Sequence, residues 1–181
     1  MEIDKSITIP ASPAAVWALL LDPLVMGACV PGMQSIEVLS ATEYVAVMHV
    51  KISFISAKFK LRTTITELRP PHYLRSEGTG EDSAVASSLK QQSEIFLTEQ
   101  PDGQTELRMK VTAQVLGRLG TFGLSAMKTK ADRMWLEFIQ SLLVRLGDTS
   151  PVSNISAEES TLEPQPVHAG ELADPVGAAP P

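Results

Sequence analysis

The sequence has little cysteine, few aromatic residues and no long apolar run. Cys29 is the only cysteine in 181 residues, so no internal disulfide can form, and this is typical of a reducing compartment. The longest apolar run covers residues 14–21, well short of the roughly 20 residues that span a bilayer. The first residues lack the basic and apolar regions of a secretory signal. We therefore expect a cytoplasmic chain, with peripheral contact at the inner face of a membrane left open.

Positive charge is missing from the end of the chain. The formal net charge is −6, and residues 151–181 contain five acidic residues and no Lys or Arg. The remaining 150 residues are therefore nearly neutral, which argues against a nucleic-acid partner. The end of the chain is also rich in proline and lacks aromatic residues, so it cannot bury enough apolar surface to fold. We expect a folded domain over 1–147 and a disordered, acidic, Pro-rich tail over 148–181.

Hydrophobic periodicity divides residues 1–147 into strands and helices. A strand is expected over 2–9, and Ser12-Pro13 and Asp22-Pro23 each provide a cap and a first-turn proline for a short helix. From residue 33 the period is two, which predicts about six further strands. The clearest of these cover residues 44–54, 57–66, 72–80, 85–99 and 104–116.

A long amphipathic helix is expected at the end of the domain. Apolar residues recur at spacings of three and four from about 119 to 146, with Gly120 and Gly123 weakening the start and Gly147 as the stop. This order of elements predicts an α+β helix-grip fold, in which a curved antiparallel sheet of about seven strands wraps around the long helix. The outer face of the sheet would carry charge, including a basic row of Lys58, Lys60 and Arg62. Such a row is usually a solvated surface, although anionic lipid or an acidic partner could contact it.

Several short motifs carry a resemblance to a known family. They are Asp22-Pro23 with Cys29-Val30-Pro31-Gly32, then Glu77-Gly78-Thr79-Gly80, then Ala113-Gln114-Val115-Leu116-Gly117. In order and spacing, residues 1–146 resemble the carbon monoxide dehydrogenase G-subunit family of the START-like, polyketide cyclase-like (SRPBCC) superfamily. Many members have a second cysteine where this chain has Met33, and a glycine-rich stretch where it has residues 81–87.

The resemblance implies a helix-grip fold and an accessory role. Members are encoded beside molybdenum-containing carbon monoxide dehydrogenase and related hydroxylases. They are linked to recruitment of the enzyme to the membrane and to handling of a lipophilic quinone.

A sheet wrapped on one helix leaves a space in which an apolar ligand can lie. The large apolar side chains predicted to point into this space include flexible methionines, which suit a ligand-binding wall; they are Trp17, Met48, Phe54, Phe59, Phe122, Met127, Met134 and Phe138. The polar side chains predicted to face inward are Thr63, Ser76, Gln91 and Ser93. If buried they need partners, and a ligand carbonyl or hydroxyl would be one. Each of these residues can equally be an ordinary core residue.

Catalytic and metal-binding groups are scarce. The sequence around Cys29 is apolar and supplies no base, which favours a packed structural residue. One cysteine with the separated His49 and His72 does not make a zinc site. Glu67 is the only acid that we assign to the inner face. We predict no catalytic residue, no metal and no cofactor.

Three functions remain in view. The leading hypothesis is a non-catalytic accessory protein that holds a quinone-like molecule or other lipid and serves a molybdenum hydroxylase or carbon monoxide dehydrogenase. The second is a cyclase or hydrolase of the same superfamily, acting on an aromatic or polyketide substrate with Glu67 in an acid–base pair. The third is an assembly adaptor with a filled core. The ligand, partner enzyme and oligomeric state are left open.

Overall fold

The structure, a computed structural model, describes residues 1–149. Seven strands form one antiparallel sheet in the order β1-β7-β6-β5-β4-β3-β2. The elements are β1 Glu2–Ile9, α1 Pro13–Leu21, α2 Pro23–Cys29, β2 Met33–Val38, β3 Glu43–Ile52, β4 Ile55–Arg69, β5 Tyr73–Asp82, β6 Ser87–Glu99, β7 Thr105–Gly117, the 3-10 turn η1 Leu119–Phe122, and α3 Gly123–Thr149. Of the predicted tail, residues 148 and 149 continue α3, and 150–181 lie outside the described residues.

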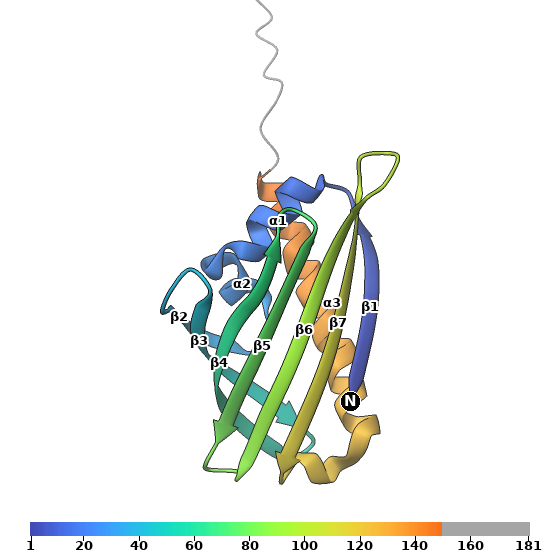
Figure 1. Cartoon of the computed structure of the whole chain (residues 1–181). Coiled ribbons are helices and arrows are strands. Elements are labelled where there is room, and N and C mark those ends of the chain that lie inside the picture. The colour runs from blue at the N-terminus through green and yellow to red at the C-terminus, as the bar shows by residue number, and fades with distance from the viewer. Residues whose placement is uncertain (150–181) are drawn as a thin grey trace, which may run out of the picture. The chain divides into compact units, whose positions relative to one another are not determined.

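The sheet curves around α3, and α1 and α2 cover one end of the space between them (Figure 1). The predicted α+β helix-grip architecture is therefore confirmed. Along β4 the burial alternates as expected, with Ala57 and Phe59 buried and Lys58 and Lys60 exposed. An antiparallel sheet with one packed face and one wet face produces this pattern.

Local signals in the sequence account for the two short helices. The Ser12 hydroxyl accepts a hydrogen bond from Ala15 N at 3.3 Å and caps α1. Asp22 Oδ1 accepts from Leu24 N at 2.8 Å and Val25 N at 3.2 Å and caps α2. Each cap satisfies backbone N–H groups that have no partner within the first turn of a helix.

Two predicted positions are wrong. The alternating pattern puts Phe54 in a strand, but β3 and β4 pair as far as Ile52 and Ile55, so Ser53 and Phe54 form a two-residue turn. Phe54 is 81% exposed there. The same pattern puts Glu67 on the inner face, but a bulge between residues 65 and 67 reverses the alternation in β4. Glu67 then pairs with Arg75 on the outer face and forms an ion pair with Arg69.

The ends of α3 also differ from the prediction. The chain makes the 3-10 turn first, and α3 begins at Gly123, whose φ of +78° is a conformation that L side chains rarely adopt. Gly147 does not stop the helix, which continues to Thr149. A single glycine in a helix costs only about 1 kcal/mol relative to alanine, so it does not impose a stop.

Asp82 is an inward acid that lies beyond residue 80, where the sequence predicted this strand to end. It lies at the end of β5, is buried, and accepts hydrogen bonds from the backbone N–H groups of Lys58, Ala84 and Val85. These bonds, led by the one from Lys58, hold the pKa of Asp82 below its ordinary value of 3.8. The carboxylate thus joins the start of β4 to the turn between β5 and β6.

Because folding lowers the pKa of Asp82, the stability that its charge provides is present above pH 3.8 and is lost as the pH falls through the folded pKa. We expect Asp82→Asn to lower the free energy of unfolding at pH 7 by about 1–3 kcal/mol. The difference in the free energy of unfolding between the variant and the wild type should shrink below pH 3.8. Urea unfolding at pH 7 and at a pH below 3.8 measures both differences. Glu81→Gln, an exposed neighbour with the same charge change, serves as the control. An equal difference at both pH values would contradict the assignment.

Candidate functional site between the sheet and the long helix

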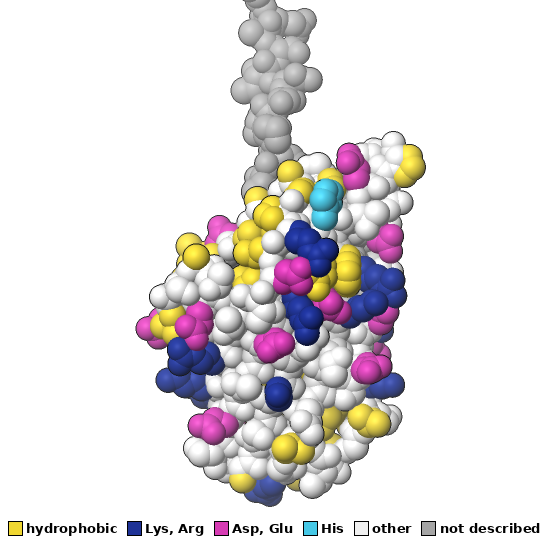
Figure 2. All heavy atoms as spheres, in the orientation of Figure 1, with side chains coloured by type: hydrophobic (Ala, Val, Ile, Leu, Met, Phe, Trp, Pro, Cys, Tyr) yellow, Lys and Arg dark blue, Asp and Glu magenta, His cyan; other side chains and the backbone are white. Residues whose placement is uncertain are grey.

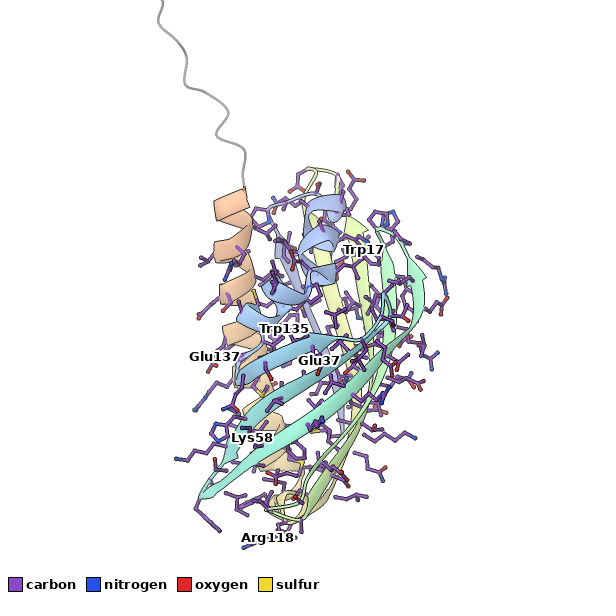
Figure 3. All side chains as sticks on the ribbon, turned by 90° about the vertical axis from the view of Figure 1, so that its left-hand side faces the viewer. Trp17, Glu37, Lys58, Arg118, Trp135 and Glu137 are labelled. Atoms are coloured by element: carbon purple, nitrogen blue, oxygen red, sulfur yellow. The ribbon has the colours of Figure 1, made fainter. Side chains whose placement is uncertain are left out.

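Two separate apolar clusters fill the ends of the space between the sheet and α3. The capped-end cluster lies beside α1 and α2, and its buried members are Ile9, Val16, Trp17, Leu19, Leu20, Cys29, Leu74, Leu97, Leu107, Trp135, Phe138, Ile139 and Leu142. The tip cluster lies near the β3–β4 turn and consists of Ile55, Ala57, Phe59 and Leu119. Figure 3 shows Trp17 and Arg118 at the two opposite ends of the domain. The apolar packing is thus interrupted in the middle.

A band of polar side chains occupies this interruption. On β4, Thr63 lies between Leu61, which packs on the tip cluster, and Ile65, which packs on the capped-end cluster. On β6, Gln91 and Ser93 lie between Leu89 of the tip side and Ile95 of the capped side. The strand register adds two more members, and we call the full set the polar band: Tyr44, Thr63, Ser76, Gln91 and Ser93. The four polar residues predicted to face inward therefore do meet, in one place.

Most members of the polar band are already partnered. The Ser76 and Ser93 hydroxyls hydrogen-bond to each other at 2.8 Å. Burial raises the pKa of Tyr44, and a hydrogen bond with the Thr63 side chain acts in the opposite direction. Among the described residues, Gln91 is the member whose side chain has no hydrogen-bond partner. The side chains of Tyr44, Thr63, Ser76 and Ser93 thus have hydrogen-bond partners within the band, whereas the Gln91 carboxamide has none there.

The segment of α3 opposite the band carries methionines. Phe122 packs on the tip cluster and Trp135 belongs to the capped-end cluster, so the helix crosses the band between these two residues. Met127 is buried and Met134 is half-buried in this segment, and neither belongs to a cluster. Met134 and Gln91 are both half-buried, so neither residue is fully enclosed.

The other predicted residues are distributed between the ends. Trp17 and Phe138 belong to the capped-end cluster, and Phe59 to the tip cluster. Met48 is half-buried and pairs with Phe59 across β3 and β4. Phe54 stays outside, with its ring edge-on to Phe122 at 5.6 Å between centroids. Phe54 is therefore not on the inner wall.

Three residues of this region were not singled out from the sequence. They are Tyr44 of the polar band, Trp135 of the capped-end cluster, and Lys5, which joins α3 to the edge of the sheet. Tyr44 lies in the alternating pattern without being singled out by it, and Trp135 fits the helical spacing three residues before Phe138. Lys5 on β1 forms an ion pair with Asp132 on α3 at 2.8 Å. The alternation Ile3, Lys5, Ile7 in β1 indicates that Lys5 shares their face.

The site contains no acid–base pair among the residues that the structure describes. The oxygens of Asp82 are occupied by three backbone N–H groups, and Glu67 faces outward. Cys29 is 2% exposed, and burial raises the pKa of its thiol, which favours the unreactive protonated form. Within residues 1–149 no group of three or more His, Cys, Asp or Glu could hold a metal ion.

A separate hollow lies on the outer face of the sheet. It has a volume of about 570 Å³ and is lined by Arg69, His72, Tyr73, Glu94, Phe96, Leu97, Thr98 and Glu99. Its polar groups already interact with one another, because Tyr73 donates to Glu94 at 2.7 Å and Arg69 lies 4.7 Å from the Tyr73 ring centre. Figure 2 shows acidic and basic side chains intermingled on this face. We therefore place the candidate site at the polar band, where a polar group remains free.

Solved structures share this fold at low sequence identity. A conserved protein from Geobacillus kaustophilus is 22% identical with a TM-score of 0.76, over 82% of this chain and 96% of that chain. A START superfamily protein from Mycobacterium smegmatis is 11% identical with a TM-score of 0.63, over 82% and 99%. The Zhui aromatase/cyclase from Streptomyces sp. R1128 is 16% identical with a TM-score of 0.59, over 81% and 93%. These similarities establish the START-like fold.

The sequence comparison is more specific. Comparison with curated proteins gives no match. No helix within residues 1–149 is long and apolar enough to cross a membrane. The profile of CoxG, the G-subunit of carbon monoxide dehydrogenase, matches residues 6–147, nearly all of the described chain. With the helix-grip fold and the motifs at residues 22–32 and 77–80, this match shows that the chain belongs to the CoxG family.

Proposed function

We propose that the protein is a non-catalytic carrier that holds an apolar small molecule, such as a quinone or another lipid, between the sheet and α3. The observation that carries the proposal is the interruption of the apolar core by the polar band. A continuous core would stabilise the fold more, since each buried CH₂ contributes about 0.8 kcal/mol. A ligand with an apolar body and a polar group would complete the packing on both sides of the band.

The lining of the site fits such a ligand. Met127 and Met134 present flexible, polarizable side chains that adapt to different shapes. Two charged groups of the inner face are already engaged, Lys5 by Asp132 and Asp82 by backbone amides. A neutral ligand is therefore favoured over an ionic one, because burying an unpaired charge is costly.

Family membership directs the proposal toward a partner. The CoxG family takes its name from the G-subunit of carbon monoxide dehydrogenase. We propose that the protein acts as an accessory protein to such a dehydrogenase or a related molybdenum hydroxylase, in its maturation, membrane recruitment or supply of electron acceptor. The carrier requires no cofactor of its own.

An enzymatic role finds less support. One structural neighbour is described as an aromatase/cyclase. Acid–base chemistry would need a carboxyl group free to exchange a proton beside the ligand. The outward position of Glu67 removes the acid on which this alternative depends.

We propose that one end of the domain contacts the membrane from which the ligand is taken. The apolar tip consists of Phe54 and Leu124, which are 81% and 60% exposed, with Phe122 against Phe54. Lys51 and Arg118 are exposed near them in sequence and supply positive charge. Exposed apolar side chains flanked by cations favour a surface of anionic lipid. The tip also adjoins the start of α3, where movement of the helix would admit a ligand.

The carrier function predicts a ligand that copurifies with the protein. Native mass spectrometry with lipid extraction should detect a bound apolar molecule in the wild-type protein. Met134→Trp should remove it by filling the space beneath α3, whereas Leu136→Trp should retain it, because Leu136 is 61% exposed on the same helix. Repeated recovery of empty wild-type protein would favour the assembly adaptor instead. Equal retention by both variants would place the ligand outside the proposed site.

The apolar tip predicts binding to anionic vesicles. Phe54→Glu should weaken cosedimentation with vesicles of phosphatidylglycerol and phosphatidylcholine roughly tenfold or more, since burying a phenylalanine contributes about 1.5–3 kcal/mol. Leu136→Glu makes a similar change on an exposed site of α3 and should leave binding unchanged. An equal loss in both variants would show that charge alone, rather than the tip, controls the contact.

A further inference from the structure

A glycine lies between two members of the polar band, Thr63 and Gln91. The strand register aligns Tyr44, Thr63, Gly78 and Gln91 side by side across β3, β4, β5 and β6. Gly78 is the member without a side chain. We call the position above this glycine the notch, and the side chains of Thr63 and Gln91 lie over it.

Side chains from both neighbouring strands converge on this notch. A Cβ atom built on Gly78 would lie 3.0 Å from Gln91 Nε2, 3.3 Å from Gln91 Cγ and 3.1 Å from Thr63 Oγ1. The carboxamide of Gln91 and the hydroxyl of Thr63 thus reach toward one point from opposite sides. Any larger side chain at position 78 would displace at least one of them.

The Gln91 carboxamide is available for binding. Its side chain makes no hydrogen bond to any described residue, and Gln91 is half-buried rather than sealed. A carboxamide has two donor hydrogens on Nε2 and an acceptor oxygen. Thr63 is buried and is oriented by Tyr44 from the next strand. One fixed hydroxyl and one free amide therefore border the notch.

We propose that Gln91 and Thr63 form a polar subsite over Gly78 that selects apolar ligands carrying a neutral carbonyl group. The carbonyl oxygen accepts a hydrogen bond from Gln91 Nε2, and the apolar body of the ligand extends beneath Met127 and Met134. Lys5, whose side chain lies on the inner face of β1, is engaged by Asp132 at the sheet edge. Burying a carboxylate without a counter-ion is costly, so a neutral carbonyl is the ligand group that suits the carboxamide. This subsite rests on the proposed carrier function and specifies its ligand class.

A matched pair of ligands tests the subsite. The probes 2-acetylnaphthalene and 2-ethylnaphthalene have similar shapes, but only the first has a carbonyl. Titration of the purified full chain should show that the wild-type protein binds the ketone about three- to tenfold more tightly, the effect of one net hydrogen bond. Gln91→Leu should remove this preference while still binding 2-ethylnaphthalene, which also verifies that the variant is folded. Gln92→Leu, on the outer side of the same strand, should keep the preference.

A second variant covers the case in which Gln91→Leu does not fold. Gly78→Ala places a methyl group in the notch and should reduce the ketone preference with both Gln91 and Thr63 present. An unchanged preference in folded Gln91→Leu or Gly78→Ala would overturn the subsite and leave the carrier function standing. Failure of the wild-type protein to bind either probe would count against the carrier function itself.

Discussion

The structure depends on the packing of one long helix against a sheet too wide for it to cover. Seven strands at a spacing of about 4.8 Å make a sheet about 29 Å across, whereas a helix with its side chains is about 10 Å wide. Curvature of the sheet reduces this difference, and α1 and α2 cover one end (Figure 1). The two apolar clusters lie toward opposite ends of α3, and the polar band lies between them.

Much of this arrangement could be predicted from the sequence. The change of period from two to 3.6 near residue 118 gives one sheet followed by one helix, because each period reflects which faces are buried. Asp22 before Pro23 marks a helix start that depends only on neighbouring residues. Periodicity also identified Thr63, Ser76, Gln91 and Ser93 as inward residues of the sheet, where they form most of the polar band.

The predictions that failed concern features that the alternation of apolar and polar residues does not record. A bulge adds one residue to a strand without any change in composition, so alternation alone placed Glu67 on the wrong face. The turn at Ser53 and Phe54 carries no Gly or Asn signal, although Ser53 has a positive φ of 54°. Which band member lacks a partner depends on pairing between distant strands, and one sequence does not reveal it. For the same reason the fold, shared with structural neighbours at 11–22% identity, says little about the ligand.

The ion pair between Lys5 and Asp132 joins the first strand to the last helix of the domain. The capped-end cluster joins the same two elements, because it contains both Ile9 of β1 and Leu142 of α3. The sheet cannot close its inner face until α3 is present. During synthesis on the ribosome, the strands would emerge first, with their apolar face uncovered and the helix still missing. Until the 27 residues of α3 have been made, this apolar face is exposed to aggregation, so α3 protects the sheet during synthesis as well as stabilising the finished fold.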